Sequence, residues 1–183
     1  MRGARGKLVA IVGPSGSGKD TLLSGLVRLL PDIHWARRTI SRPPSAETEP
    51  FESVSAAGFA ALRAADAFAL HWPAHGLNYG IRHAELAAIG QGRTVVFNGS
   101  RKALLDTAAR FPTLRVIAIT VPPRVLAARL AARGRESADD IARRLDRAAQ
   151  SLPEGLNAQV ISNDDTPEVG IARLIAALQP ISA

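Results

Sequence analysis

The sequence has 183 residues, 46% hydrophobic and 21% charged, which indicates one folded domain and excludes a disordered chain. The absence of cysteine excludes disulfides, thiolate metal sites and cysteine nucleophiles, and it agrees with a reducing, cytoplasmic location. A net charge of +7 favours anionic partners such as phosphorylated small molecules, and no basic run with interleaved aromatic residues points to nucleic acid.

The N-terminal half alternates apolar runs with helical patterns. The apolar run at 7–12 predicts a buried strand and not a signal peptide, because it is short and a glycine-rich loop follows at once. No run approaches the roughly 20 residues that span a bilayer, so we expect no membrane partner. The further patterns predict, in order, a helix over 19–30, a strand over 34–40, a loop or small irregular subdomain over 41–55, a short helix over 59–65, a strand over 67–72 and a helix over 82–90.

The C-terminal half continues the alternation. Its patterns predict a strand over 94–97, a helix over 101–110, a strand over 115–121, helices over 122–133 and 137–151, a strand over 158–162 and a helix over 167–178. Strands that alternate with helices predict an α/β fold with a mostly parallel sheet and helices on both faces. Ser137, with two acids just after it, fits the N-cap of its helix.

A phosphate-binding loop of the Walker A type lies between the first strand and the first helix. Its residues are Gly13, Pro14, Ser15, Gly16, Ser17, Gly18, Lys19, Asp20 and Thr21. Small residues let backbone N–H groups converge on phosphates at a helix N-terminus, and Lys19 reaches the β- and γ-phosphate oxygens. The pattern departs at one position, because Asp20 stands where Ser or Thr usually holds Mg²⁺.

Asp20 and Thr21 are therefore the candidate metal ligands. Asp20 could bind Mg²⁺ directly, hold a metal-bound water, or only cap the helix; we favour a metal role. The usual second acid at the end of a later strand is missing, since the strand over 94–97 is followed by Asn98. Mg²⁺ binding would then depend on nucleotide phosphates and water, which Mg²⁺ tolerates.

Five short motifs resemble a known family. They are Gly-Ser-Gly-Lys-Asp at 16–20, Arg-Thr-Ile-Ser-Arg at 38–42, His-Gly-Leu-Asn-Tyr-Gly at 75–80, Asn-Gly-Ser-Arg at 98–101 and Arg-Gly-Arg-Glu at 133–136. Together they resemble the ribose 1,5-bisphosphate phosphokinases, relatives of guanylate kinase. The resemblance implies a P-loop kinase with a five-stranded parallel sheet, formed by a core over 7–41, 93–125 and 151–183. It also implies an acceptor-binding insertion over 42–92 and a helical lid over 126–150.

The resemblance implies that ATP phosphorylates ribose 1,5-bisphosphate to 5-phosphoribosyl 1-diphosphate, with Mg²⁺ as cofactor. On the donor side it implies that Arg129, Asn163 and Asp164 bind ATP beside the loop. It assigns the catalytic cations to Lys19, Arg133, Arg135 and Arg144. The expected acceptor-binding residues are Arg38, Arg42, His75, Tyr79, Asn98 and Arg101.

The lid arginines also have a geometric argument. Arg129 and Arg133 are four residues apart on one predicted helix, and Arg144 and Arg147 are three apart on the next, so each pair shares a face. Gly134 makes the connection beside Arg135 pliable. Such faces could close over phosphates, or they could be solvated surfaces paired with nearby acids; for Arg147 both interpretations stay open.

Guanylate kinase is the first alternative, and several positions oppose it. Arg42 keeps the first arginine of that family's phosphate-binding stretch, while Ser45 replaces the second. Phe51 replaces one of its two tyrosines, and Tyr79 keeps the other. Leu70 stands where an acid reads guanine, and such polar contacts carry most of the discrimination between substrates. Other nucleoside monophosphate kinases, a non-catalytic binding module of the same fold and a nucleic-acid binder are further alternatives; an intact Lys19 opposes the binding module.

Overall fold

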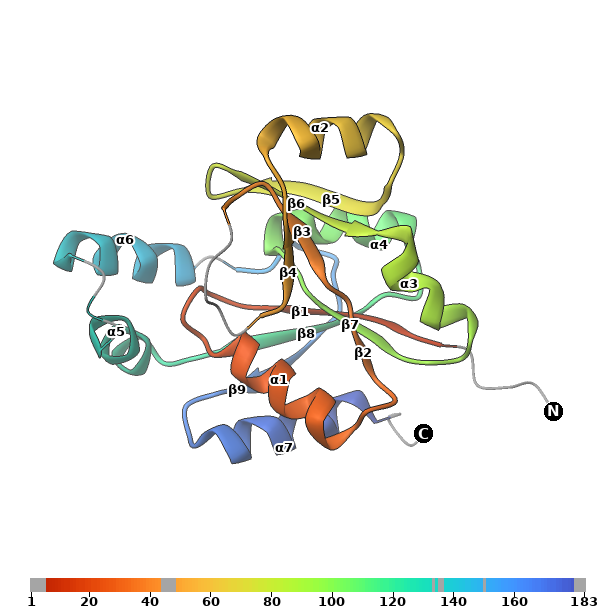
Figure 1. Cartoon of the computed structure of the whole chain (residues 1–183). Coiled ribbons are helices and arrows are strands. Elements are labelled where there is room, and N and C mark those ends of the chain that lie inside the picture. Colours follow the sequence, from red (N-terminus) through yellow and green to blue (C-terminus); the bar gives the residue numbers. More distant parts are fainter. Residues whose placement is uncertain (1–5, 44–48, 133, 135–136, 150, 180–183) are drawn as a thin grey trace.

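The computed structural model describes residues 6–43, 49–132, 134, 137–149 and 151–179. A five-stranded, wholly parallel sheet forms its centre, in the order β2-β7-β1-β8-β9 (Figure 1). The strands are β1 (Leu8–Val12), β2 (His34–Trp35), β7 (Val95–Asn98), β8 (Arg115–Thr120) and β9 (Ala158–Ser162). Every residue of β1 and β7 is buried, as expected for central strands of a parallel sheet.

Helices cover both faces of this sheet. On one face α1 and α7 lie side by side, and their leucines pack on Ile11 and Ile117 (Figure 1). On the other face a short 3-10 turn, η1, leads into α4, whose Leu104 is buried against Phe97 and its neighbours. The bounds of these elements are α1 (Lys19–Leu29), η1 (Arg101–Ala103), α4 (Leu104–Arg110) and α7 (Pro167–Leu178). A further helix, α3, spans His83–Gly90.

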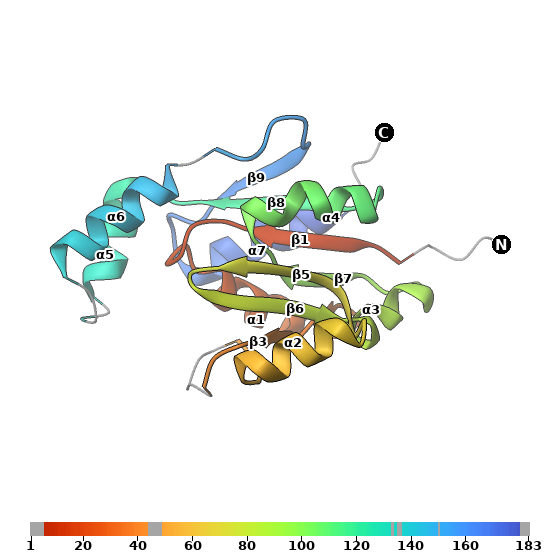
Figure 2. The ribbon, with the colours of Figure 1, turned by 90° about the horizontal axis from the view of Figure 1, so that it is seen from above.

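A second, mixed sheet of four strands stands across the first, in the order β4-β3-β6-β5, with α2 on its outer side (Figures 1 and 2). Its elements are β3 (Arg38–Ile40), β4 (Phe51–Ser53), α2 (Ala56–Ala64), β5 (Phe68–Ala74) and β6 (Leu77–Arg82). Leu70, Trp72 and Tyr79 of this sheet share one apolar core with Ala10 and Phe97 of the first. The shared core fixes the second sheet close to the phosphate loop.

Two helices, α5 (Pro123–Ala132) and α6 (Ala138–Ala148), project to one side of the domain, beyond the end of β8 (Figure 2). Ser137 caps α6 as expected: its hydroxyl accepts from the Asp140 N–H at 3.2 Å, and Asp140 accepts from the Ser137 N–H at 3.2 Å. No side chain of α6 is buried. The helix is therefore not part of the core, and the name lid is used below for α5 and α6 together.

The α/β fold with a parallel sheet is confirmed, and most predicted elements lie within a few residues of their expected places. Three features differ. The single strand predicted over 34–40 is two strands, since β2 pairs with β7 while β3 pairs in the second sheet. The second sheet thus begins at Arg38, within the segment 7–41 that the sequence assigns to the core. The loop predicted over 41–55 contains β4, and β6 has no counterpart among the predicted strands. Within the described residues, no helix has the length and apolar character needed to cross a bilayer.

Candidate active site

The phosphate loop connects β1 to α1 and folds around its own lysine. The ammonium of Lys19 donates to the carbonyl oxygens of Gly13 at 2.9 Å and Pro14 at 2.8 Å. Burial lowers the pKa of Lys19 to about 8, although Asp20 opposes the shift. The positive charge of Lys19 is therefore costly unless an anion lies beside it.

Asn163, which follows β9, holds the phosphate loop through a hydrogen bond. Its side chain is buried and its Nδ2 donates to the carbonyl of Ser17 at 2.7 Å. Gly18, with φ of 85°, lies against that amide, and a Cβ there would stand 2.6 Å from Asn163 Nδ2. The same Cβ would lie 3.9 Å from Arg129 Nη1, so the two predicted ATP-binding residues flank one point of the loop.

A chain of polar groups runs from the loop to the second sheet. The Nδ2 of Asn98 donates to Asp20 Oδ1 at 2.9 Å and to Glu49 Oε2 at 3.2 Å. Glu49 in turn accepts from Arg38, whose Nε lies 2.6 Å from Oε1 and whose Nη2 donates to Oε2. Burial raises the pKa of the Glu49 carboxyl, and Arg38 opposes that shift. The donor side and the expected acceptor side are thus joined through Asn98 and Glu49.

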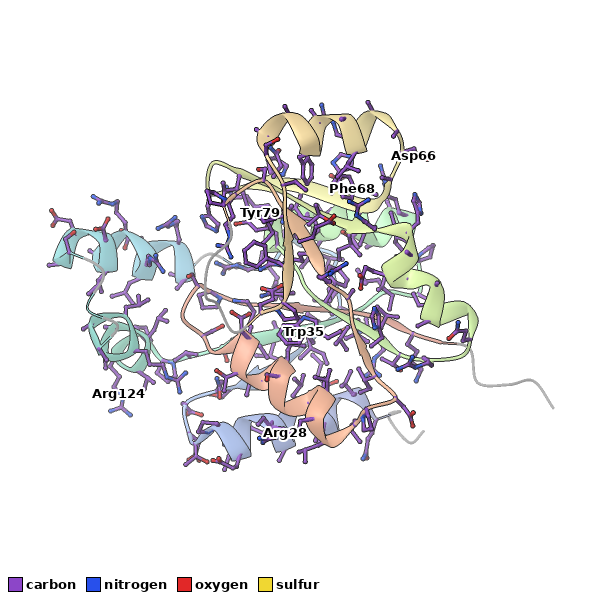
Figure 3. All side chains as sticks on the ribbon, in the orientation of Figure 1. Arg28, Trp35, Asp66, Phe68, Tyr79 and Arg124 are labelled. Carbon is purple, nitrogen blue, oxygen red and sulfur yellow. The ribbon has the colours of Figure 1, made fainter. Side chains whose placement is uncertain are left out.

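Aromatic rings hold the arginines of the second sheet. The Tyr79 ring, labelled in Figure 3, stacks on Trp72 with centroids 5.9 Å apart, and Arg38 Cζ lies over the same ring, 5.0 Å from its centroid. Arg42 lies over the Phe51 ring at 4.4 Å. The phenyl ring that replaces a tyrosine of guanylate kinase therefore still supports an arginine, through its π face and not through a hydroxyl.

The lid reaches the loop and the end of β7 through arginines. Arg144 donates to the Ser15 hydroxyl at 2.9 Å. Arg101, expected at the acceptor, donates instead to the last carbonyls of α6, at 2.6 Å to Arg147 and 3.2 Å to Ala148. A cavity of about 330 Å³ separates α6 from the end of β8. Hydrogen bonds from Arg144 and Arg101 therefore connect the lid helix to the rest of the domain.

His75 occupies the tip of the β5–β6 hairpin with φ of 53°, in the left-handed region. Desolvation, followed by the nearby cations Arg147, Arg144 and Lys102, lowers the pKa of its imidazole. The ring is therefore neutral at pH 7 and can supply a hydrogen bond but no positive charge. Its acceptor role stays a prediction.

The remaining predicted residues lie in several places. Asp164 is exposed and pairs with Arg173 at 3.0 Å. Thr21 is exposed on α1, away from the buried Asn98. Arg133 and Arg135 lie outside the described residues, as does Ser45. The structure thus gathers Lys19, Asp20, Asn98, Arg38 and Tyr79, with Arg144 above the loop.

Glu49 is the site residue that sequence reasoning missed. It is one acid in a segment rich in Ser, Thr and Pro, and nothing in its neighbours distinguishes it from a solvated loop residue. The structure gives it only 3% exposure. A buried carboxylate that is paired on both sides is far from the usual surface behaviour of glutamate.

Comparisons with known proteins agree with this geometry. No family model matches the chain. The "Ribose 1,5-bisphosphate phosphokinase PhnN" of Ruegeria sp. (strain TM1040) is 47% identical over 178 residues, which is 96% of this chain and 93% of that protein. The protein of the same name from Acidiphilium cryptum (strain JF-5) is 46% identical over 176 residues, 94% of this chain and 92% of its own length.

Among solved structures, a guanylate kinase from Anaplasma phagocytophilum has a TM-score of 0.71 at 18% identity and covers 100% of this chain and 90% of its own. At that identity the likeness shows the fold, a P-loop kinase fold of the guanylate kinase type. The sequence identity with the bacterial relatives shows more. The chain belongs to the family of ribose 1,5-bisphosphate phosphokinases.

Proposed function

We propose that this kinase transfers the γ-phosphoryl group of ATP to the anomeric phosphate of ribose 1,5-bisphosphate and releases ADP and 5-phosphoribosyl 1-diphosphate. Full-length identity of 47% to a protein named for this acceptor supports the substrate. The observation that supports the chemistry is the chain of hydrogen bonds from Asp20, the neighbour of Lys19 in the phosphate loop, through Asn98 and Glu49 to Arg38. The chain connects the loop proposed to bind the donor phosphates with an arginine proposed to bind an acceptor phosphate.

The phosphoryl transfer requires no covalent bond to the protein. An oxygen of the anomeric phosphate attacks the γ-phosphorus, the bond from that phosphorus to the bridging oxygen breaks, and ADP leaves with the electron pair. The second pKa of a phosphate is about 6, so the attacking oxygen is already ionised at neutral pH and needs no general base. The protein must bring two anions together in line and neutralise charge.

The donor site can be assigned from the loop outward. Lys19 would exchange its bonds to the Gly13 and Pro14 carbonyls for the β- and γ-phosphate oxygens. Arg129 and Asn163 flank Gly18, where the nucleoside end of ATP would extend. Arg144 already lies on Ser15 and would bind the same phosphates when the lid closes. Arg133 and Arg135 are proposed as further lid cations from the family motif alone.

Asp20 fits a role toward Mg²⁺. Within the described residues no group of three or more His, Cys, Asp or Glu side chains could hold a metal ion. Mg²⁺ is often held by only one or two carboxylates together with substrate phosphates, and Asp20 stands at the start of α1 beside the loop. When bound with ATP, Mg²⁺ would neutralise the charge that develops between the β- and γ-phosphates.

The position at which guanylate kinases read guanine holds an apolar side chain in this protein. Leu70, at the position of the guanine-reading acid, is 3% exposed and pairs with Ile81 within the apolar core. Arg38, Arg42 and His75 instead offer cations and a hydrogen-bond donor, which suit the two phosphates of a sugar bisphosphate. These groups oppose the alternative of a guanylate kinase.

The proposal is tested by phosphorus NMR of the protein with Mg-ATP and, separately, ribose 1,5-bisphosphate, GMP and AMP. The expected result is a new pair of coupled diphosphate signals on the sugar at C1, with GMP and AMP unchanged. Conversion of GMP to GDP without a sugar product would overturn the proposal. Binding of ATP with no transfer to any acceptor would favour the non-catalytic module.

A further inference from the structure

We propose that Glu49 is a positioning residue of the acceptor site, which fixes the orientation of Arg38 toward the acceptor's phosphate. The inference rests on the proposed function, because it assigns the phosphate-binding role to Arg38. Glu49 precedes β4, and Arg38 begins β3, so the pair also joins two neighbouring strands of the second sheet.

The guanidinium of Arg38 is held by two residues, Glu49 and Tyr79. Glu49 takes both Nε and Nη2, in the two-point geometry that fixes the plane of a guanidinium. The Arg38 Cζ lies over the Tyr79 ring, 5.0 Å from its centroid. The remaining nitrogen, Nη1, makes no hydrogen bond with any residue that the structure describes, so it is the donor that an acceptor phosphate would meet.

Charge alone does not account for a carboxylate here. The proposed site must attract two phosphates, and a buried negative charge beside Arg38 weakens that attraction. Burial of an ion pair is also a poor source of stability, because desolvation offsets the attraction of the two charges. What the carboxylate supplies, and a neutral side chain would not, is a fixed orientation of the arginine.

The Glu49 carboxylate also contacts a residue that reaches the donor side of the site. Asn98 Nδ2 donates to both Glu49 and Asp20, so the position of Glu49 also sets the position of that amide. A side chain of different length or hydrogen-bonding type at position 49 would release Arg38 and Asn98 together. Misplacement of reacting groups by about 1 Å can cost on the order of 10²-fold in rate.

The test uses two substitutions at this position. Glu49→Gln has the same shape, but its amide N–H₂ group would face an arginine N–H group, so one of the two bonds is lost. Glu49→Asp keeps the charge but is one methylene shorter, so it cannot make both bonds from the same backbone. Both variants should lower kcat for ribose 1,5-bisphosphate by about 10–100-fold. For Glu49→Gln the acceptor KM should change little, since the lost negative charge favours anion binding.

A matched control lies three residues away. Glu52 accepts from Arg82 with the same two-point geometry, at 2.8 and 2.6 Å, and this pair is about 30% exposed; Glu52 also accepts from the Thr39 hydroxyl at 2.7 Å. Glu52→Gln should leave kcat and acceptor KM within about twofold of the wild type. The control separates orientation at the site from the loss of any Arg–Glu pair in the same sheet.

A double-mutant cycle completes the test. Arg38→Lys keeps the charge but cannot form the two-point pair, so Glu49→Gln added to it should cost less activity than it costs in the wild type. If Glu49→Gln reduces the yield of folded protein, Glu49→Asp and Arg38→Lys carry the same comparison with both charges retained. ATP affinity, measured by calorimetry with a non-hydrolysable analogue, should stay within about twofold in every variant.

The outcomes are separable. A wild-type protein that transfers no phosphate to ribose 1,5-bisphosphate contradicts the proposed function. An active wild type whose folded Glu49→Gln and Glu49→Asp variants keep kcat within about twofold contradicts the role of Glu49 alone. Independent, additive losses from Arg38→Lys and Glu49→Gln would also contradict it, because the two residues would then act separately.

Discussion

Arg144 of the lid helix donates a hydrogen bond of 2.9 Å to the hydroxyl of Ser15 in the phosphate loop, across 129 positions of sequence. The contact places the guanidinium of Arg144 on the loop, where the γ-phosphoryl group of ATP is expected to bind. This bond and those from Arg101 connect α6 to the phosphate loop and to η1. We expect the lid to move when phosphates compete for its arginines.

Arg101 should act on the lid and not on the acceptor. Its guanidinium donates to the carbonyls of the last two residues of α6, at the C-terminus of the helix, where carbonyl groups run short of intrahelical donors. Arg101→Met removes these charge-assisted bonds, and we expect kcat/KM for ATP to fall about 10-fold or more. Hydrogen exchange of the α6 amides, measured by mass spectrometry, should become faster.

Arg143→Met is the matched control on the same helix, because Arg143 pairs only locally with Asp140 at 2.7 Å. It should change neither α6 exchange nor kcat/KM by more than about twofold, as expected for an exposed pair. If Arg101→Met raises the acceptor KM while exchange of α6 stays unchanged, Arg101 binds the acceptor as the family motif implies, and the lid role is wrong.

The pH dependence of kcat/KM for ATP should follow the ionisation of Lys19. Burial lowers its pKa to about 8, so the free enzyme loses this positive charge as the pH rises through 8. Bound phosphates stabilise the ammonium, so the charge persists to higher pH once ATP is bound. We expect kcat/KM for ATP to fall by roughly tenfold per pH unit above that value while kcat stays flat.

The profile is measured from about pH 7 to 9.5, with Lys19→Ala as the inactive reference. Lys19→Arg keeps a guanidinium that does not titrate in this range, so any residual activity should lack the decline. A wild-type kcat/KM that stays constant across the range would refute the assignment of Lys19 as the phosphate-binding cation with a lowered pKa.

Asp20 should set the metal requirement. Asp20→Ala removes the carboxylate beside the loop and leaves Asn98 with Glu49 as its only acceptor among the contacts described above. We expect the Mg²⁺ concentration for half-maximal activity to rise by about tenfold, because Mg²⁺ would be held by phosphates and water alone. Binding of Mn²⁺ with a non-hydrolysable ATP analogue, followed by electron paramagnetic resonance, should weaken in parallel. Unchanged titrations with both metals would reject the metal role of Asp20.

Asn163→Asp should lower the stability of the fold and raise the KM for ATP. The substitution replaces the N–H donor to the Ser17 carbonyl with a carboxylate oxygen in a buried position. The lost bond and the buried acceptor should cost about 1–3 kcal/mol of unfolding free energy, or roughly 2–4 °C in Tm for each kcal/mol. Thermal unfolding and the KM for ATP provide the two measurements.

Gln159→Glu makes the same chemical change at an exposed position of β9 and should alter Tm by less than about 1 °C, in line with surface substitutions. An Asn163→Asp variant with wild-type Tm and wild-type KM for ATP would show that Asn163 does not support the loop.

The parts of the fold that follow local rules were predictable. Leucine spacing and the glycine-rich loop place α1 and its N-terminus, because helix periodicity and phosphate-loop geometry are encoded by neighbouring residues. The strand over 34–40 was different: its two halves are similarly apolar, and only their pairing with β7 and with β6 assigns them to separate sheets. Strand β6 contains Asn78 and Gly80, which favour turns, and it becomes a strand through pairing on both sides.

The residues of the site also fall into a predictable group and an unpredictable one. Lys19 and Asp20 follow from a contiguous motif, while Glu49 and Arg101 act through partners far along the chain. Glu49 meets Asn98 across 49 residues, and Arg101 meets Arg147 across 46. No spacing rule predicts such contacts, because they depend on how the second sheet and the lid are placed on the core.

The central claim is that this kinase selects a sugar bisphosphate over a nucleotide, and the most direct measurement is the ratio of kcat/KM for ribose 1,5-bisphosphate to that for GMP, at fixed Mg-ATP. We expect a ratio above about 10³, since a site that lacks a polar partner for guanine, with Leu70 buried in its place, gives no binding energy to the base. A ratio near or below one would contradict the account and would make the chain a guanylate kinase that reads its base through other residues.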